Sequence, residues 1–417
     1  MLKRCLDATL ALPLLLLLSP VLATVATLCW LTTGRVLRAR TVAGRRGRPA
    51  TLFEFSLPSG RGSGLLRRLG VARLPWIWHV LRGDLSWIGP RPLPIGAPRP
   101  AGFQRRSCDR PGVVCLWWIR QRANVDYDTE WAADAEYVEN VSLRQDLGIA
   151  ARACWVRLLH PGRRIAKPRI EVLNTPIRNV SMDEAVNELH ELLLTDGPPT
   201  QVAFVNADCV NLTCRNSDYA NCLRTVNWNY ADGIGMKWAA CLQGASVRQN
   251  VNGTDLFPRL LAALEDSGQA VYLLGGEQGV SADVARWIQR RFPGAHVAGH
   301  EHGYFDEGSE QEVIERINRS GADLLLVAMG APRQDLWIQR VLSQLEVRVA
   351  IGVGGLFDFY SGRKQRAPQW MREMGMEWAY RLWLEPRRLW RRYLVGNAVF
   401  LARVALHTLF RKQEKQP

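Results

Sequence analysis

Two polar residues, Asn206 and Asp232, each follow a hydrophobic run with the length of a β-strand. Ala203-Phe204-Val205 ends at Asn206, and the run from Val226 to Tyr230 leads to Ala231-Asp232-Gly233-Ile234-Gly235. Open α/β sheets hold their ligands where strands end, so the two side chains are expected to form a polar site at one sheet edge. A carboxylate there can take a proton from a hydroxyl group. The alternative is that Asp232 only caps a helix beginning at Ile234.

Two glycine pairs, Gly275-Gly276 and Gly354-Gly355, also follow strand candidates. Their backbone N–H groups could face phosphate oxygens. Neither pair has the spacing of a dinucleotide fingerprint, so the sequence does not favour an oxidoreductase. Asp255 and Asp358 are rival bases by residue type. Asp255 is expected to cap a helix beginning at Leu256, and Asp358 to hold a nucleotide ribose or a turn.

The elements that position these residues alternate between strand and helix after Ile170. Ser181 with Glu184 forms a capping-box pattern at the start of the first helix. Alternation at this spacing predicts an α/β fold, a Rossmann-like parallel sheet with helices on both faces. The strand candidates are Gln201–Val205, Ala270–Leu274, His296–Ala298, Leu324–Ala328 and Arg348–Val353, and Val280–Phe292 and Glu310–Ser320 are helices between them.

The composition indicates a membrane-associated protein of two or three domains. The chain has 417 residues, 47% of them hydrophobic, and a net charge of +15. Basic residues cluster in the first 100 residues and after Arg387, where Trp and Leu lie between them. That pattern fits an anionic membrane face or a phosphate-bearing lipid, and no nucleic-acid motif accompanies it. The nine cysteines form no CxxC pair, so neither a zinc site nor a disulfide framework is indicated, and a reducing cytoplasm fits them.

The segment Ala8–Thr33 carries no charge and is long enough to span a bilayer. Ser19-Pro20 interrupts it, and proline removes a backbone hydrogen bond and bends a helix. A broken helix can enter and leave by the same face, with the Ser19 hydroxyl serving a freed carbonyl. The basic flank beyond the segment favours this re-entrant anchor over a span or a cleaved signal peptide.

Three arginines near the C-terminus, Arg381, Arg388 and Arg391, are spaced so that one helix would present them on a single face. Guanidinium groups suit phosphate oxygens, and the interleaved aromatic residues suit a bilayer interface. The alternative is a solvated basic stripe. The apolar segment Val395–Phe410 is expected to lie on or dip into the membrane.

Residues 1–160 resemble the monotopic bacterial sugar transferases, which load a sugar phosphate onto polyprenyl phosphate. The matching blocks are Lys3–Asp7, Ser19-Pro20, Val80–Pro92 and Arg110–Val113. The catalytic Asp-Glu pair of that family aligns with Ala72-Arg73, and its Lys-Phe-Arg element reads Glu54-Phe55-Ser56. Alanine cannot be a nucleophile, so this domain is predicted to be a catalytically silent anchor or lipid-phosphate cradle. Asp126-Tyr127-Asp128 could pass for a metal-binding motif, but a solvated acidic turn is favoured.

After a proline-rich and basic linker at residues 161–169, residues 170–395 resemble the WecG/TagA/CpsF glycosyltransferases, a metal-independent inverting family. The matching blocks are Phe204–Asn206, Ala231–Gly235, Asn252–Leu256, Leu274–Gly276, His302–Phe305, Met329–Asp335, Gly352–Asp358, Arg366–Pro368 and Glu377–Leu382.

The resemblance implies a general base at Asp232, with Asn206 and Gln334 lining the pocket. It also implies that Arg381, Arg388 and Arg391 grip a lipid diphosphate from a C-terminal appendage. Where the family often has threonine and arginine, this chain has Phe204 and Asn250. Arg248 would share a face with Asn250 in an extended segment and could replace the missing arginine.

The resulting prediction is a fusion with four parts: a degenerate sugar-transferase domain (1–160), the linker (161–169), a glycosyltransferase domain (170–370) and the appendage (371–417). It would move a hexose or N-acetylhexosamine from a UDP-sugar to a polyprenyl-diphosphate-linked sugar at the cytoplasmic face of the inner membrane, in envelope-glycan assembly. No metal or cofactor is expected, and a homo-oligomer is left open. Two alternatives remain, a bifunctional enzyme with an active N-terminal domain and a non-catalytic scaffold.

Overall fold

The computed structural model describes residues 2–58, 66, 70–97, 109–123, 130–159, 167–306 and 308–413. The chain forms two compact units, Met1–Gly162 with Arg372–Met374, and Arg163–Met371 with Gly375–Pro417. Asp126-Tyr127-Asp128 and residues 161–166 of the predicted linker lie outside the described residues.

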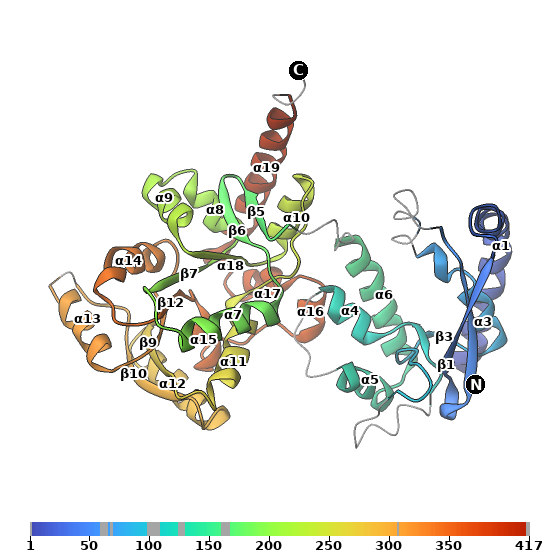
Figure 1. Ribbon diagram of the computed structural model, residues 1–417, viewed down its shortest axis with the longest axis horizontal. Coiled ribbons are helices and arrows are strands. Elements are labelled where there is room, and N and C mark those ends of the chain that lie inside the picture. Colours follow the sequence, from blue (N-terminus) through green and yellow to red (C-terminus); the bar gives the residue numbers. More distant parts are fainter. Residues whose placement is uncertain are drawn as a thin grey trace. The chain divides into compact units, whose positions relative to one another are not determined.

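The second unit is built on an eight-stranded sheet with the order β10-β9-β11-β12-β7-β8-β6-β5 (Figure 1). All neighbouring strands are parallel except β5 and β6. The prediction of a mixed α/β fold with a large parallel sheet is confirmed, and each predicted strand is present within a few residues of its expected bounds. The strands are β5 (Arg169–Val172), β6 (Thr175–Arg178), β7 (Thr200–Val205), β8 (Trp228–Ala231), β9 (Ala270–Gly275), β10 (His296–Glu301), β11 (Leu324–Ala328) and β12 (Val349–Gly352).

Helices cover both faces of this sheet because consecutive strand residues point to opposite faces. Leu273 and Leu326 belong to one core cluster, whereas Leu274 and Val327 belong to another on the opposite face. Helices between the strands supply the remaining core residues. They are α7 (Met182–Leu194), α8 (Ala207–Thr213), α9 (Ser217–Thr225), α10 (Ile234–Leu242), α11 (Gly253–Leu264), α12 (Val280–Arg291), α13 (Glu310–Arg319), α14 (Arg333–Val341) with the short turn η4 (Leu342–Gln344), and α15 (Leu356–Tyr360).

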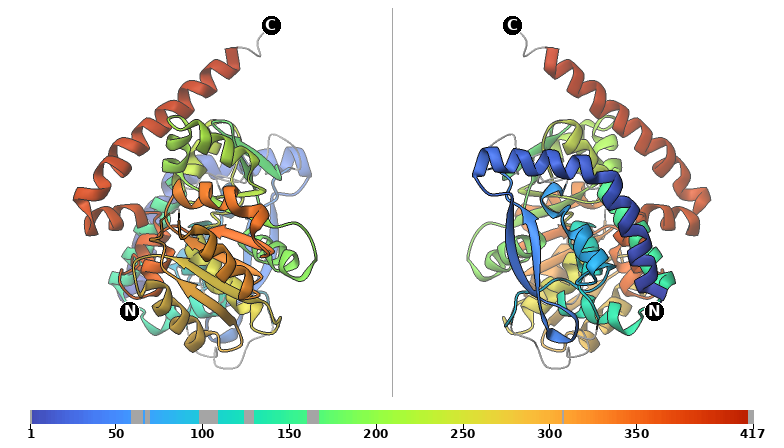
Figure 2. Two further views of the ribbon diagram at one scale, coloured as in Figure 1. Left: turned by 90° about the vertical axis from the view of Figure 1, so that its left-hand side faces the viewer. Right: turned by 90° about the vertical axis from the view of Figure 1, so that its right-hand side faces the viewer.

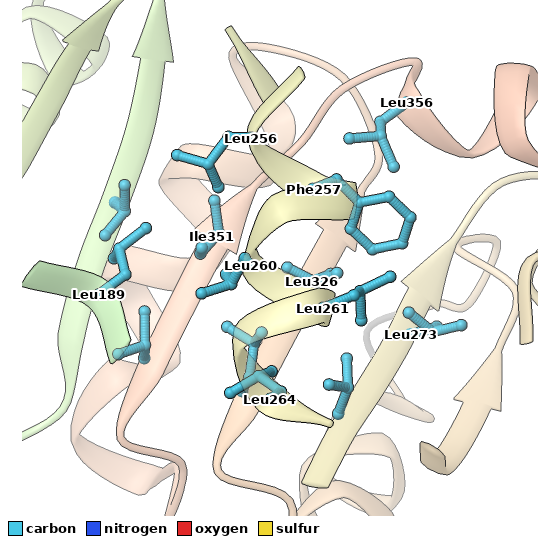
Figure 3. Close-up of a cluster of buried hydrophobic side chains, with 14 of the residues drawn as sticks. Leu189, Leu256, Phe257, Leu260, Leu261, Leu264, Leu273, Leu326, Ile351 and Leu356 are labelled. Carbon is cyan, nitrogen blue, oxygen red and sulfur yellow. The ribbon is translucent and has the colours of Figure 1, made fainter. Parts of the chain in front are cut away.

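Figure 3 shows how α11 lies against the sheet, with its leucines packed towards Leu326 and Ile351 on the strands and Leu189 of α7. Burying a leucine of this kind contributes roughly 1.5–3 kcal/mol. The predicted capping box at the start of α7 is confirmed, since the Ser181 hydroxyl accepts from the Glu184 N–H and the Glu184 carboxylate accepts from the Ser181 N–H.

The C-terminal segment is interrupted and does not form one helix. After α16 (Gln369–Glu373), α17 (Glu377–Leu384) ends where Glu385 leaves the helical conformation at φ −129° and ψ 61°. It is followed by α18 (Pro386–Trp390), the π-helical turn η5 (Arg391–Val395) and α19 (Gly396–Gln413). Phe400 and Val404 of α19 are fully buried in a core cluster with residues of α8 and α10. The expectation that Arg381, Arg388 and Arg391 share one helix face is therefore wrong.

In the first unit, α1 (Leu2–Thr33) bends sharply partway along its length (Figure 2). Pro20 cannot donate to the Leu16 carbonyl, and the Ser19 hydroxyl donates to it at 2.7 Å instead, as the sequence predicts. The buried carboxylate of Asp7 fixes the start of α1 by accepting from the Ser86 hydroxyl at 2.8 Å and the Trp87 N–H at 3.2 Å.

The rest of the first unit consists of a hairpin, a small parallel strand pair and short helices. The described elements are β1 (Leu37–Ala43), η1 (Arg45–Gly47), β2 (Pro49–Phe55), η2 (Val71–Arg73), α3 (Trp76–Arg82), β3 (Ser86–Ile88), β4 (Gly112–Val114), α4 (Leu116–Ala123), α5 (Glu130–Glu139) and α6 (Leu143–Leu159). Two helical stretches of the described chain, Leu2–Thr33 and Pro386–Phe410, are long and apolar enough to cross a membrane, judged by length and composition alone.

Candidate active site

Asn206 and Asp232 lie side by side at the ends of two paired strands. Val205 of β7 pairs with Ala231 of β8, so the next residue of each strand emerges at the same sheet edge. The Asp232 N–H donates to the Val205 carbonyl at 2.9 Å, which continues the pairing one step further. The Asn206 side chain forms a hydrogen bond with the Asp232 carboxylate. The polar pair expected from the sequence is therefore present.

The carbonyl oxygen of the Asn206 side chain is already engaged. It accepts from the N–H groups of Asp208 at 3.0 Å and Cys209 at 3.1 Å, as the N-cap of α8. Its NH2 group is therefore the part that donates to Asp232. A fixed donor of this kind restricts the orientation of the carboxylate.

Asp232 does not cap the following helix. The N-cap of α10 is Gly233, and no side chain bonds to the end of this helix as a cap. The turn is held by Asn250 instead, whose side-chain oxygen accepts from the Gly233 N–H. Asn250 stands where the resembled family often has arginine, and its contribution to the turn was not predicted.

The surroundings of Asp232 raise the pKa of its carboxyl group to about 6. Burial is the largest cause, and the negative charge of Glu377 adds to it. The positive charges of Arg381 and Arg392 and the hydrogen bond from Asn206 act in the opposite direction. A carboxylate with this pKa is mostly ionised at pH 7 and is a stronger base than an exposed aspartate.

A row of alternating charges connects Arg381 to a second acid, Asp255. The Arg381 guanidinium lies 3.3 Å from the Glu377 carboxylate, and Glu377 lies 3.6 Å from Arg366. Arg366 in turn lies 2.6 Å from the buried carboxylate of Asp255. Arg366 and Glu377 belong to two of the sequence blocks that resemble the glycosyltransferase family, but their spacing in the sequence does not predict that they pair.

Asp255 is not the helix cap that the sequence predicts. Helix α11 begins at Gly253, and the side chain of Asn252 accepts from the Asp255 N–H at 2.8 Å as its N-cap. The predicted cap lies three residues too late, because the capping residue is Asn252, which precedes Gly253. The Asp255 carboxylate accepts from the Asn252 amide at 2.8 Å, so both its oxygens have strong partners.

Gln334 holds two glycine turns together. Its buried side-chain oxygen accepts from the N–H groups of Gly330 at 3.1 Å and Gly354 at 2.8 Å. In a third glycine turn, which follows β9, the Gly276 N–H donates to the Ala328 carbonyl at 3.0 Å. The N–H groups of Gly276 and Gly354 are thus used within the fold. Gly275 has φ +138°, and a Cβ atom there would lie 2.5 Å from the Ala328 carbonyl oxygen, so close strand packing requires glycine.

The remaining predicted residues have partners of their own. Asp358, next to Gly355 at the start of α15, pairs with Lys364 at 2.8 Å. Arg248 pairs with Glu184 at 2.8 Å. Arg388 is exposed and pairs with Glu385 at 2.9 Å, and Arg391 is exposed over the Trp390 ring at 5.4 Å.

The structure therefore brings Asn206, Asp232 and Arg381 together and adds Glu377 and Arg392 to them. Within the described ranges, no three His, Cys, Asp or Glu side chains are grouped as metal ligands would be.

In the first unit, Ala72 and Arg73 form part of the short turn η2. Arg73 lies 3.9 Å from the Glu54 carboxylate and 4.8 Å from the centre of the Trp76 ring. Glu54 is buried and also pairs with Arg38 at 2.8 Å. Arg73 and Glu54, two residues that differ from the sugar-transferase pattern, therefore form an ion pair with each other.

Two family models match this chain. Residues 170–414 match the family described as "Glycosyl transferase WecG/TagA/CpsF family", over more than half of the chain, and residues 60–160 match "Bacterial sugar transferase". These matches agree with both resemblances noted from the sequence.

Curated relatives are similar to this chain over 50–57% of its length. A protein of Bacillus spizizenii is 34% identical over 209 residues, 50% of this chain and 80% of the relative. A protein of Bacillus subtilis is 29% identical over 221 residues, which is 53% of this chain and 85% of the relative. A protein of Staphylococcus aureus is 27% identical over 238 residues, which is 57% of this chain and 92% of the relative. Each is named N-acetylglucosaminyldiphosphoundecaprenol N-acetyl-beta-D-mannosaminyltransferase.

Proposed function

Because this chain belongs to the WecG/TagA/CpsF glycosyltransferase family, we propose that it moves a hexose or N-acetylhexosamine from a UDP-sugar to a polyprenyl-diphosphate-linked sugar. The names of the relatives favour N-acetylmannosamine as the donor sugar and N-acetylglucosamine on the lipid acceptor. The product would enter the assembly of an exopolysaccharide or another envelope glycan.

The observation that carries this proposal is the environment of Asp232. Its carboxylate accepts a hydrogen bond from Asn206, has a pKa raised to about 6 mainly by burial, and lies near the positive charge of Arg381. A base and a cation in one half-buried site are what an inverting transfer needs.

In the proposed reaction, Asp232 takes the proton of an acceptor hydroxyl as its oxygen attacks the anomeric carbon. A new glycosidic C–O bond forms, the bond between the sugar and UDP breaks, and UDP leaves with the bonding electrons. Attack opposite the departing group gives inversion and a β-linkage. Arg381 offsets the negative charge that develops on the diphosphate.

We propose that the protein is monotopic at the cytoplasmic face of the inner membrane. The bend of α1, the proline at position 20 inside this helix, its apolar exposed length and the basic residues beyond it support a re-entrant anchor. The exposed apolar residues Leu406, Leu409 and Phe410 of α19 support a second contact with the bilayer.

The first unit would serve as an anchor without chemistry of its own, since Ala72 supplies no nucleophile and Arg73 pairs with Glu54. A bifunctional enzyme would need a different carboxylate to act as the nucleophile that Ala72 does not supply. A non-catalytic scaffold would not need a carboxylate whose pKa is raised near the positive charge of an arginine.

The test uses purified full-length protein with a panel of UDP-sugars and short-chain lipid-diphosphate acceptors carrying one sugar. We expect release of UDP and a lipid product heavier by one sugar. Release of UMP would support the bifunctional alternative. Absence of any nucleotide release across the panel would support the scaffold.

A further inference from the structure

Helix α19 packs against the two helices that begin at the proposed base and at its hydrogen-bond partner. Asn206 is the N-cap of α8, and Asp232 comes directly before Gly233, the N-cap of α10. Phe400 and Val404 of α19 are fully buried in the core cluster that also contains residues of α8 and α10 (Figure 1). A helix near the C-terminus therefore contacts both elements that carry the Asn206–Asp232 pair.

The ring of Phe400 lies where the first turns of α8 and α10 meet. A Cβ atom added to Gly235, in the first turn of α10, would lie 3.3 Å from the Cβ atom of Ala207 in α8 and 3.8 Å from the Cε1 atom of Phe400. Protein interiors are close-packed, and a junction of this kind has no spare volume to absorb a change. Altering the size of the ring should therefore shift the first turns of the two helices.

Hydrogen bonds of Asn211, a buried residue of α8, fix the position of α19 along that helix. The Asn211 amide donates to the Gly396 carbonyl at 2.8 Å, and its oxygen accepts from Arg403 at 2.9 Å. Gly396 and Arg403 are about two turns of α19 apart, because an α-helix has about 3.6 residues per turn. Phe400 lies between these two contacts in the sequence, so they hold its ring at the junction.

The side chains of the pair are tied to the helices that follow them. The Asn206 oxygen accepts from the N–H groups of Asp208 and Cys209, so the direction of its NH2 group is fixed to the first turn of α8. Asp232 leads into α10 through Gly233 alone. Sheet pairing decides where the two residues lie. The spacing of α8 and α10 then decides the length and angle of the hydrogen bond between their side chains.

We propose that Phe400 is a positioning residue for the transfer reaction. It holds the first turns of α8 and α10 at the spacing that directs the Asn206 amide onto the Asp232 carboxylate, and Asn211 holds Phe400 in place. The inference rests on the proposed function, because Asp232 is the base in that reaction. The alternative is that Phe400 contributes to stability alone, as any buried phenylalanine does.

The first experiment compares Phe400→Ala with Phe292→Ala in the purified full-length protein. Phe292 follows α12 and is buried in the core cluster on the other face of the sheet, so its loss creates a cavity away from the junction. Both variants should melt at a lower temperature than the wild type. Only Phe400→Ala should lower kcat and kcat/KM together, by roughly 10–100-fold, because a misplacement of about 1 Å at a site can cost this much.

Gly235→Ala disturbs the same junction without removing a core side chain. The new Cβ atom would lie 3.3 Å from the Cβ atom of Ala207, which is closer than ordinary contact, so the neighbouring helix must move by a few tenths of an ångström. Alanine is a better helix former than glycine, so the melting temperature should fall less than in Phe400→Ala. A lower kcat in Gly235→Ala therefore reports the positions of the helices and not a loss of stability.

The titration of the Asp232 carboxyl group is a second readout. It is measured by carbon NMR on protein with isotope-labelled aspartate, and Asp232→Asn identifies the signal. The hydrogen bond from Asn206 lowers the pKa of this group, so a weakened bond should raise the midpoint in Phe400→Ala. Phe292→Ala should leave the midpoint unchanged.

A double variant separates the hydrogen bond from the charges around Asp232. Arg381 and Arg392 also lower the pKa of Asp232, and Glu377 raises it. The titration is therefore repeated in an Asn206→Ala background. There, the Phe400 substitution should produce no further shift, because the bond through which it acts is already absent.

Equal kcat values in Phe400→Ala and Phe292→Ala would overturn the proposal, and so would equal shifts of the midpoint with and without Asn206. If Phe400→Ala does not fold, Phe400→Leu keeps more of the volume and should change kcat and the midpoint in the same directions by less. The NMR titration needs no turnover. A shift in a protein that transfers no sugar would leave the role of Phe400 standing and the proposed function refuted, whereas sugar transfer with identical phenylalanine variants would do the reverse.

Discussion

The side chains of Asn206 and Asp232 form a hydrogen bond across two neighbouring strand ends. This contact follows from the register of β7 and β8, in which Val205 pairs with Ala231. A shift by one residue would turn one of the side chains to the opposite face of the sheet. The position of the proposed base is therefore determined by sheet pairing, and its orientation by the amide of Asn206.

Replacing Asp232 with asparagine should reduce kcat by about 10²–10⁴-fold, because general-base catalysis contributes that much. The side chain keeps its size, so the fold should be unchanged. UDP release and circular dichroism measure the two effects. Asp358→Asn is the comparison, because its carboxylate pairs with Lys364 and is the rival base. Turnover equal to the wild type in Asp232→Asn would remove Asp232 from its role.

The reaction rate should depend on pH through the pKa of Asp232, which is raised to about 6. Only the ionised form accepts a proton, so kcat/KM should rise with pH, with a midpoint at about 6, and level off above it. The negative charge of Glu377 contributes to the raised pKa and the positive charge of Arg381 opposes it. Glu377→Gln should therefore move the midpoint to lower pH, and Arg381→Gln should move it to higher pH. Shifts in the same direction would contradict this account.

The same carboxyl group should make stability depend on pH. Its folded pKa of about 6 lies above the ordinary value, so the folded state holds the proton more tightly than the unfolded chain. The stabilisation by this proton is present at low pH and is lost as pH rises through about 6. Asp232→Asn should accordingly raise the melting temperature relative to the wild type more at pH 8 than at pH 5. An equal difference at both pH values would show that the group is not shifted.

Removing the amide of Gln334 should destabilise the second unit. In Gln334→Leu the N–H groups of Gly330 and Gly354 lose their acceptor, and each unsatisfied buried group costs about 1–3 kcal/mol. Gln339→Leu on the same helix is the control, because Gln339 is exposed and its side-chain amide donates to the Thr225 hydroxyl at 2.7 Å. Its effect should stay within about 0.5 kcal/mol. Urea unfolding of both variants measures the difference.

Breaking the ion pair of Arg366 should cost more than breaking a surface pair. Arg366→Ala leaves the buried carboxylate of Asp255 without its positive partner, and such a change typically costs about 3–5 kcal/mol. Arg363→Ala is the matched control, because Arg363 pairs at 3.3 Å with the exposed residue Glu277 and should contribute about 0–1 kcal/mol. Similar losses in the two variants would show that the Arg366 pair is not a buried interaction.

The local patterns of the sequence predicted the framework correctly. Strands β7, β9, β10, β11 and β12 and the helices between them follow from hydrophobic periodicity, which reports which residues face a core. The capping box of Ser181 and the hydrogen bond of Ser19 were predictable because their partners lie within four residues. Asp232 was recognisable for the same reason, since a strand end and a glycine turn are both local features.

Tertiary structure decided which distant charges meet Asp232. Regular helical spacing grouped Arg381 with Arg388 and Arg391, but the break at Glu385 and the π-helical turn η5 interrupt that helix, and Arg392 lowers the pKa of Asp232 together with Arg381. The position of this segment depends on burial of Phe400 and Val404 in a core cluster with residues of α8 and α10, which no local pattern encodes. The sequence by itself indicated the proposed base and the sheet that carries it, because both depend on neighbours along the chain. Packing between segments far apart in the sequence decided its cationic partners.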